Sequence, residues 1–134
     1  MTRWSSAGPK WRRAEEYGFD HAWTYDHIGW LDYVDGPWFG AIPTLTAAAL
    51  STSRIKLGTF VASPNFRHPV PLMRELITLD DLSGGRFVLG LGAGDDGYDA
   101  DVLGEPALTP RHRMDRFVEF VDALDGLLTT DGFD

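Results

Sequence analysis

Residues 54–96, the stretch around which the rest of the chain is organised, contain two patterns of hydrophobic residues: short continuous runs, and between them a spacing typical of a helix. Two short apolar runs have the composition of buried β-strands, and they consist of Ile55, Leu57, Phe60 and Val61 and of Phe87, Val88, Leu89 and Leu91. Between the runs, Leu72, Leu76 and Leu79 recur at the i, i+4, i+7 spacing of a helix that buries one face. The pattern predicts a strand, a helix and a second strand parallel to the first.

The segment before this stretch is typical of a helix followed by a strand. Ser5 or Ser6 is expected to cap the helix, with Pro9 in its first turn and Gly18 at its end. Residues 21–25 then alternate in the manner of a short strand, which would deliver the next residues to a loop at its carboxyl end.

Three further signals complete the expected order of elements. A second helix is indicated by its apolar positions Ile42, Leu45 and Ala49. Gly84 and Gly85 would end the central helix, because glycine adopts the left-handed conformation without a steric cost. Thr109 and Pro110 are typical of an N-cap and a first turn. The helix after them is predicted to be amphipathic, with apolar residues Met114, Phe117, Val118, Val121, Leu124 and Leu128.

Strands that alternate with helices predict an α/β fold with a parallel sheet, either part of a (βα)8 barrel or part of an open doubly wound sheet. A full barrel takes about 250 residues. A chain of 134 residues is therefore expected to form one domain over residues 1–134. If that domain belongs to a barrel, it would lack the first strand and everything after the fourth helix.

Composition excludes several classes of function. Twelve Lys and Arg against 20 Asp and Glu give a net charge of −8, which would repel nucleic-acid phosphates. The absence of cysteine excludes disulfides, thiolate metal sites and a cysteine nucleophile. The chain has neither an apolar run of the roughly 18 residues that a membrane span needs nor a signal peptide, so we expect no membrane association and a cytoplasmic location.

Candidate functional residues follow each expected strand, where parallel α/β folds bind their ligands. Asp26 and His27, with Trp30 nearby, follow the first strand; residues 59–63 end the second, and residues 93–96 follow the third. The imidazole of His27 can accept or donate a proton near neutral pH, and the adjacent Asp26 carboxylate could orient it. A solvated pair in a loop is the alternative interpretation.

Residues 92–97 fit the G-x-G-x-x-G pattern of dinucleotide-binding sites. We reject that interpretation, because two aspartates would oppose a phosphate and no helical pattern follows until Thr109. The glycines are expected to let a flat ring approach the backbone, or to form a turn. A metal site is not predicted, because Asp26, His27, Asp95 and Asp96 show no ligand-spacing motif.

Aromatic residues gather after the first strand. Trp30, Trp38 and Phe39 could line a pocket for an aromatic or apolar ligand, or could pack within the loop or the core. His21 and His112 are interpreted as structural or surface residues, on the first strand and the last helix.

Three stretches together resemble the luciferase-like monooxygenase superfamily, and within it the branch that uses the deazaflavin coenzyme F420. They are WRRAEEYGFDHAWTYDH (residues 11–27), TAAALSTSRIKLGTFVASPNFRHP (46–69) and LDDLSGGRFVLGLGAGDD (79–96). The resemblance implies a (βα)8 TIM barrel, usually dimeric, that binds a flavin or deazaflavin at the carboxyl ends of its strands. The chain would then be a partial barrel with roughly strands 2–4 and their helices.

The resemblance also implies roles for individual residues. Asp26 and His27 match the Asp-His pair of the F420 branch, in which the histidine lies beside the reactive carbon of the coenzyme and can handle the substrate proton. Phe60 and Val61 match the position of a non-prolyl cis peptide that supports the coenzyme ring. Trp30 resembles a tryptophan of the substrate pocket, with a spacing from the histidine that is one residue shorter.

A third motif carries a departure from the family pattern. Ala93, Gly94 and Asp95 match a cofactor-binding Thr-Gly-Glu motif in the sugar-phosphate dehydrogenases of this branch. Alanine lacks the hydroxyl group and aspartate is one methylene shorter than glutamate, so a sugar phosphate is not the expected substrate.

Three hypotheses follow for function. The first is an oxidoreductase that transfers hydride through F420 to or from a small organic substrate, and Asp26 with His27 favours it. The second is an FMN-dependent monooxygenase that uses molecular oxygen. The third is an inactive, truncated fragment with an unclosed sheet, which folds only with a partner such as a second copy.

Overall fold

The computed structural model describes residues 3–30, 35–95 and 98–129. Asp96 and Gly97, which belong to the glycine-rich loop considered above, lie outside the described residues. The three described strands form one parallel sheet in the order β1-β2-β3. Their bounds are His21–Thr24 for β1, Lys56–Thr59 for β2 and Phe87–Val88 for β3.

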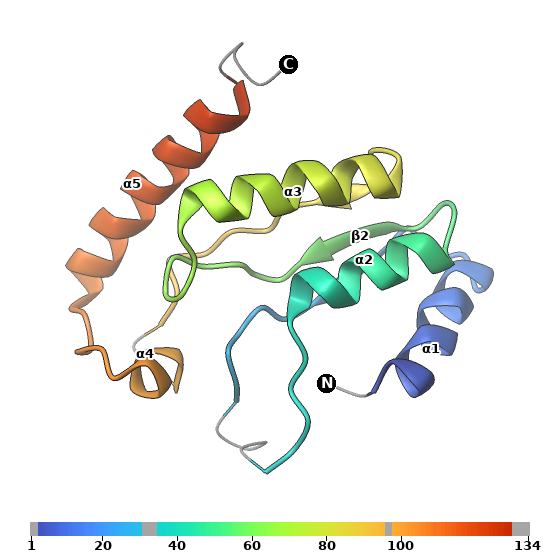
Figure 1. Ribbon diagram of the computed structural model, residues 1–134, viewed down its shortest axis with the longest axis horizontal. Helices are drawn as coiled ribbons and strands as arrows, with labels where there is room; N and C mark the ends of the chain where they lie inside the picture. The colour runs from blue at the N-terminus through green and yellow to red at the C-terminus, as the bar shows by residue number, and fades with distance from the viewer. Residues whose placement is uncertain (1–2, 31–34, 96–97, 130–134) are drawn as a thin grey trace.

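Five helices are described: α1 (Trp4–Glu16), α2 (Ala41–Ser51), α3 (Pro69–Ser83), α4 (Tyr98–Leu103) and α5 (Pro110–Thr129). α2 connects β1 to β2, and α3 connects β2 to β3. α2 and α3 lie side by side over the strands, while α1 packs against α2 and α5 against α3 (Figure 1). The predicted strand-helix-strand unit at the centre of the chain is confirmed. Within the described residues, no helix combines the length and the apolarity that crossing a lipid bilayer requires.

The hydrophobic core consists of two clusters on the helical side of the sheet. The first joins α2, α3 and β2 through buried residues that include Leu45, Leu57 and Leu79. The second joins α3 to α5 through Leu72, Met73, Leu76, Phe120 and Leu124. Each fully buried leucine contributes about 1.5–3 kcal/mol. The predicted apolar positions of α2 and α3 are therefore confirmed.

The predicted end of α3 and the predicted start of α5 are also confirmed. Gly84 ends α3 with a φ of 66°, the left-handed conformation that favours glycine. At the start of the same helix, the His68 ring accepts a hydrogen bond from the backbone N–H of Val70. α5 begins at Pro110, and the hydroxyl oxygen of Thr109 accepts a hydrogen bond from the N–H of His112 at 3.3 Å.

The predicted start of the first helix is wrong. α1 begins at Trp4, one turn early, so Ser5 and Ser6 lie inside the helix rather than at its cap, and Pro9 is an interior residue. The indole of Trp4 packs on Gly8, the buried residue of this helix. We attribute the early start of α1 to this contact. Its packing energy offsets the helical hydrogen bond that is lost at Pro9.

Two features near the carboxyl terminus also differ from the prediction. α5 buries Phe120 and Leu124 against α3, whereas Met114, Val118 and Leu128 are exposed, so the buried stripe is narrower than the predicted one. α4 was not predicted. Its six residues are too few to show a helical period.

Glu15 ties α1 to the segment that enters β2. Its carboxylate accepts hydrogen bonds from the backbone N–H groups of Ser53 and Ile55, at 3.0 and 2.8 Å, and from that of Arg54. The hydrogen bond from Ile55 is the largest cause that lowers the pKa of Glu15 from 4.5 to about 2, with the bonds from Arg54 and Ser53 adding to it against a smaller opposing effect of burial.

Arg86 has the complementary role just before β3. Its guanidinium donates to the backbone carbonyls of Ser83, Ile55 and Ala49 at 2.6, 3.0 and 2.8 Å. Ala49 lies in the last turn of α2, where a cation is favourable to the helix dipole. Glu15 and Arg86 therefore fix the amino ends of β2 and β3 by binding backbone groups.

Candidate functional site

The carboxyl ends of the three strands meet at one edge of the sheet, as predicted. The N–H of Phe60 donates to the carbonyl of Thr24 at 2.8 Å, which places the end of β2 beside the end of β1. Ala62 and Gly92 continue the pairing past β3, because the N–H of Gly92 donates to the carbonyl of Ala62 at 2.9 Å. The candidate residues after each strand are therefore brought to a common edge.

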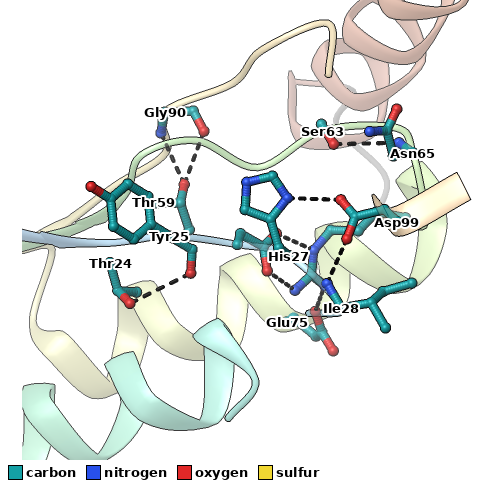
Figure 2. A network of polar contacts seen from close by, with 12 residues as sticks. Thr24, Tyr25, His27, Ile28, Thr59, Ser63, Asn65, Glu75, Gly90 and Asp99 are labelled. Atoms are coloured by element: carbon teal, nitrogen blue, oxygen red, sulfur yellow. Dashed lines mark hydrogen bonds and ion pairs between the residues drawn. The ribbon is translucent and has the colours of Figure 1, made fainter. Parts of the chain in front are cut away.

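His27 lies in the loop after β1 and is held by a carboxylate from α4. Its Nδ1 lies 2.8 Å from Oδ2 of Asp99, and the backbone N–H of Ile28 donates to Oδ1 of the same carboxylate at 2.8 Å. Figure 2 shows the Asp99 side chain directed at the His27 ring. The Asp99 side chain is 1% exposed and that of His27 is 21% exposed, so the pair joins a buried acid to a partly open imidazole.

Two tryptophans complete the surroundings of His27. The indole N–H of Trp38 donates to the carbonyl oxygen of His27 at 2.7 Å. The Trp30 ring contacts the His27 ring edge-on, with 5.1 Å between the centroids, and stacks on Tyr25. Among the described residues, none forms a hydrogen bond with Nε2 of His27. The ring is thus fixed on one side and open on the other.

The expectation that Asp26 orients His27 is wrong. Asp26 is buried, and both of its carboxylate oxygens accept from Arg67, at 2.5 Å from Nε and 2.7 Å from Nη2. Arg67 also donates to Glu75 on α3 at 3.0 Å. Because its oxygens are occupied and buried, Asp26 holds the loop of His27 in place, and Asp99 is the carboxylate that binds the imidazole.

Arg67 remains charged in this network. Burial by itself would lower the pKa of Arg67, but the hydrogen bond and the charge of Asp26, with a further contribution from Glu75, raise it above its ordinary value. The bidentate geometry between Arg67 and Asp26 is the strong form of such a pair. It joins the loop after β1 to the loop after β2.

The peptide bond between Phe60 and Val61 is cis, as the resemblance implied. Val61 packs toward two glycines after β3, and a Cβ at Gly92 would lie only 2.6 Å from Cγ2 of Val61. The hydroxyl of Thr59 donates to the carbonyl of Gly90 at 2.9 Å (Figure 2). The absence of a side chain at Gly90 and Gly92 therefore leaves room for Val61 after β2.

The third motif packs against the loop after β2. Gly94 has a φ of 74°, and a Cβ at this position would clash with the Asn65 side chain. The Asn65 amide donates to the backbone carbonyl of Asp95 at 3.3 Å, and its oxygen accepts from Arg116 on α5. Gly94 is therefore required both by its conformation and by its neighbour.

One reason for rejecting a dinucleotide site is wrong, because α4 begins at Tyr98, directly after the glycine-rich loop. The first turn of α4 carries Asp99 and Asp101, whose negative charge would oppose a phosphate. The rejection therefore rests on charge. In the described part of the chain, no group of three or more His, Cys, Asp or Glu side chains is arranged to hold a metal ion.

The other aromatic candidates separate from one another. The indole N–H of Trp38 binds the backbone carbonyl of His27, as described above. Phe39 instead lines a shallow groove of about 240 Å³ with residues of α1 and α2, including Trp4 and Pro43. Phe39 is thus not part of the His27 surroundings that the structure describes.

Sequence reasoning missed Asp99, Arg67 and Asn65. Asp99 is 72 residues from His27, and Arg67 is 41 residues from Asp26, so neither pair produces a local pattern. Nothing in the sequence separates Asp99 from the other aspartates around the glycine-rich loop. The only available signal was that Arg67 and Asp99 each follow a strand of a parallel sheet, where functional side chains gather.

This arrangement suits proton transfer. A histidine whose Nδ1 binds a buried carboxylate presents Nε2 in a defined direction. Two exposed aromatic side chains follow adjacent strands: Trp30 contacts His27, and Phe60 contacts Trp23. Such side chains can offer apolar surface to a flat ligand. The site therefore places a partly exposed imidazole beside the ring of Trp30.

Comparisons with known proteins find similar enzymes over most of the chain. The chain is 37% identical to F420-dependent glucose-6-phosphate dehydrogenase from Beutenbergia cavernae over 115 residues, which are 85% of the chain and 34% of that enzyme. It is also 37% identical to 4-hydroxyprotoasukamycin monooxygenase from Streptomyces nodosus subsp. asukaensis over 120 residues, 87% of the chain and 30% of that enzyme. The chain thus spans about a third of the length of these curated relatives.

A solved structure supports the same relationship. An F420-dependent secondary alcohol dehydrogenase in complex with an F420-acetone adduct superposes with a TM-score of 0.86 at 29% identity, over 97% of this chain and 39% of that chain. The prediction of an α/β fold that forms part of a (βα)8 barrel is confirmed. Residues 4–134 match the luciferase-like monooxygenase family, and the chain belongs to that family.

Proposed function

We propose that the chain supplies the His27 side of an oxidoreductase site that transfers hydride through F420 to or from a small organic substrate. The observation that carries the proposal is the His27 ring, fixed at Nδ1 by Asp99 and open at Nε2, at the carboxyl end of β1. Similarity to two F420-dependent dehydrogenases supports this choice of coenzyme.

The residues present fit a deazaflavin ring. The partly open His27, the exposed Trp30 and Phe60 and the cis peptide at Phe60–Val61 lie around adjacent strand ends, and none of them is sealed within the described core. In this proposal Phe60 and Val61 support the ring. The backbone of residues 93–95 approaches its edge.

Each residue of the chain then has a limited task. The coenzyme, when bound, supplies hydride chemistry. His27 accepts or donates the substrate proton at Nε2, Trp30 forms one wall of the substrate pocket, and Asp26 acts through Arg67 by holding the loop of His27. We also propose that the complete site acts in one domain that forms a homodimer.

A second candidate is an FMN-dependent monooxygenase that uses molecular oxygen. The similarity to 4-hydroxyprotoasukamycin monooxygenase favours it, because that relative matches the chain as well as the dehydrogenase does. The two candidates differ in the ring that the site accepts, so binding of the cofactor separates them.

Titration of the purified chain with F420 and, separately, with FMN tests the proposal. Cofactor fluorescence reports binding, and size-exclusion chromatography reports the oligomeric state. We expect saturable binding of F420 that is at least about tenfold tighter than that of FMN, and weakened by His27→Ala. His112→Ala, which removes an exposed histidine from α5, is the matched control and is expected to bind normally.

The other outcomes are equally informative. Tighter binding of FMN would support the monooxygenase candidate. If the folded chain binds neither cofactor, the proposed site is wrong for this chain.

A further inference from the structure

The carboxylate of Asp99 is shared between two donors on the His27 loop. Oδ1 accepts from the backbone N–H of Ile28 at 2.8 Å, and Oδ2 lies 2.8 Å from Nδ1 of His27. The backbone N–H can only donate, so it fixes the use of one oxygen. The other oxygen, which is negatively charged and cannot donate, requires a proton on Nδ1.

We propose that Asp99 is a positioning residue that holds neutral His27 in the tautomer with the proton on Nδ1, so that Nε2 is the unprotonated, proton-accepting nitrogen on the open side of the site. This inference rests on the proposed function for its purpose, because it assigns His27 the role of base toward the substrate. It concerns the chain alone, however, and can be tested without a cofactor.

The surroundings of the pair reinforce this role. Asp99 is almost fully buried, and a Cβ at Gly29 would lie 2.7 Å from the Tyr98 ring, so α4 packs closely on the loop that carries His27. The indole N–H of Trp38 also donates to the His27 carbonyl. The imidazole therefore has little freedom to turn away from the carboxylate, and the charge that forms on protonation of Nε2 is balanced by Asp99.

An asparagine at position 99 has a specific predicted effect. Its amide has one acceptor oxygen and one donor group, whereas the carboxylate has two acceptors. The amide oxygen must accept the hydrogen bond from the Ile28 N–H, because that group can only donate. The amide nitrogen then faces Nδ1 of His27 and donates to it. The proton of the neutral imidazole would consequently move to Nε2, the nitrogen on the open side of the site.

Nitrogen-15 NMR of histidine-labelled full chain, recorded above the pH at which the imidazole titrates, measures this directly. We expect His27 to carry its proton on Nδ1 with a preference of more than about tenfold in the native chain, and on Nε2 in Asp99→Asn. Asp101→Asn, an exposed acid on the same helix, is the matched control and should leave the native tautomer unchanged.

Two results would overturn the inference. One is a native chain in which His27 carries its proton on Nε2, and this measurement needs no variant to fold. The other is a folded Asp99→Asn chain whose tautomer equals that of the native chain. Since both readouts are free of cofactor, a failed F420 titration with the expected tautomers would reject the proposed coenzyme and leave the positioning role of Asp99 standing.

Discussion

Charged side chains hold together both ends of the three-stranded sheet, but they have different partners at each end. At the amino end, Glu15 and Arg86 bind backbone N–H and carbonyl groups. At the carboxyl end, Asp26 binds Arg67 and Asp99 binds both His27 and the N–H of Ile28, so pairs of side chains join the loops there. Both networks connect segments that are far apart in the sequence.

The difference separates stability from chemistry. A charged side chain that binds several backbone groups satisfies polar atoms that would otherwise lie unpaired beside the core. Most of its hydrogen-bonding atoms are then occupied and cannot bind a ligand. In the pair of His27 and Asp99, by contrast, one nitrogen of the imidazole is bound and the other has no hydrogen-bond partner among the described residues, while the side chain is partly exposed. The amino end therefore maintains the fold, while the carboxyl end presents a reactive atom.

The largest expected effect on stability comes from breaking the buried pair at the carboxyl end. Asp26→Ala leaves the guanidinium of Arg67, whose side chain is 14% exposed, with Glu75 as its remaining described carboxylate partner. We expect the free energy of unfolding to fall by about 3 kcal/mol, because a buried charge that loses its bidentate partner and keeps only a more exposed one is costly. Urea denaturation monitored by circular dichroism measures the change.

Two controls sharpen this prediction. Asp115→Ala removes an exposed carboxylate that lies 4.0 Å from Arg111, and it should change the free energy of unfolding by no more than about 0.5 kcal/mol. Combining Asp26→Ala with Arg67→Met should cost less than the sum of the two single changes, since it removes both charges. Strict additivity would show that the pair does not act as a unit.

A smaller effect, dependent on pH, is expected at the amino end. The pKa of Glu15 is about 2 in the folded chain, below its ordinary value of 4.5, so its contribution to stability is complete above about pH 4.5 and is lost as the pH falls toward 2. Glu15→Gln should cost about 1 kcal/mol at pH 7, since much of the group is solvated.

The difference between Glu15→Gln and the native chain should shrink as the pH is lowered from 4.5 to 2, because protonation removes the same charge. Denaturation at several pH values checks this, with the exposed neighbour changed in Glu16→Gln as the control. A difference that stays constant across this range would contradict the role given to the Glu15 charge.

The fold was predictable where local patterns and the core agree. Leu72, Leu76 and Leu79 lie in α3 and are buried, and Gly84 ends the helix in the left-handed conformation. The start of α1 was missed because the i, i+4 contact of Trp4 with Gly8 was not weighed against the serine caps, and α4 was missed because it is short and is held by a contact distant in the sequence. Trp4 packs on Gly8, and Asp99 of α4 binds the loop of His27.

The candidate site was predictable in part for the same physical reason. Strand order alone places His27, the cis peptide and the glycine-rich loop at one edge of the sheet. The partner of a given charge is not set by strand order, since an aspartate next to His27 in the sequence points instead to Arg67. Choosing between Asp26 and Asp99 required the geometry of loops that meet only after folding.

The measurement that tests the contrast between the two ends most directly compares His27→Ala with Arg86→Met for both F420 affinity and the free energy of unfolding. We predict that His27→Ala weakens binding by more than about tenfold and changes stability by less than about 1 kcal/mol. Arg86→Met should lower stability by about 2 kcal/mol and leave the affinity of the folded chain unchanged. If both variants lose affinity and stability together, the two ends of the sheet do not have separate roles.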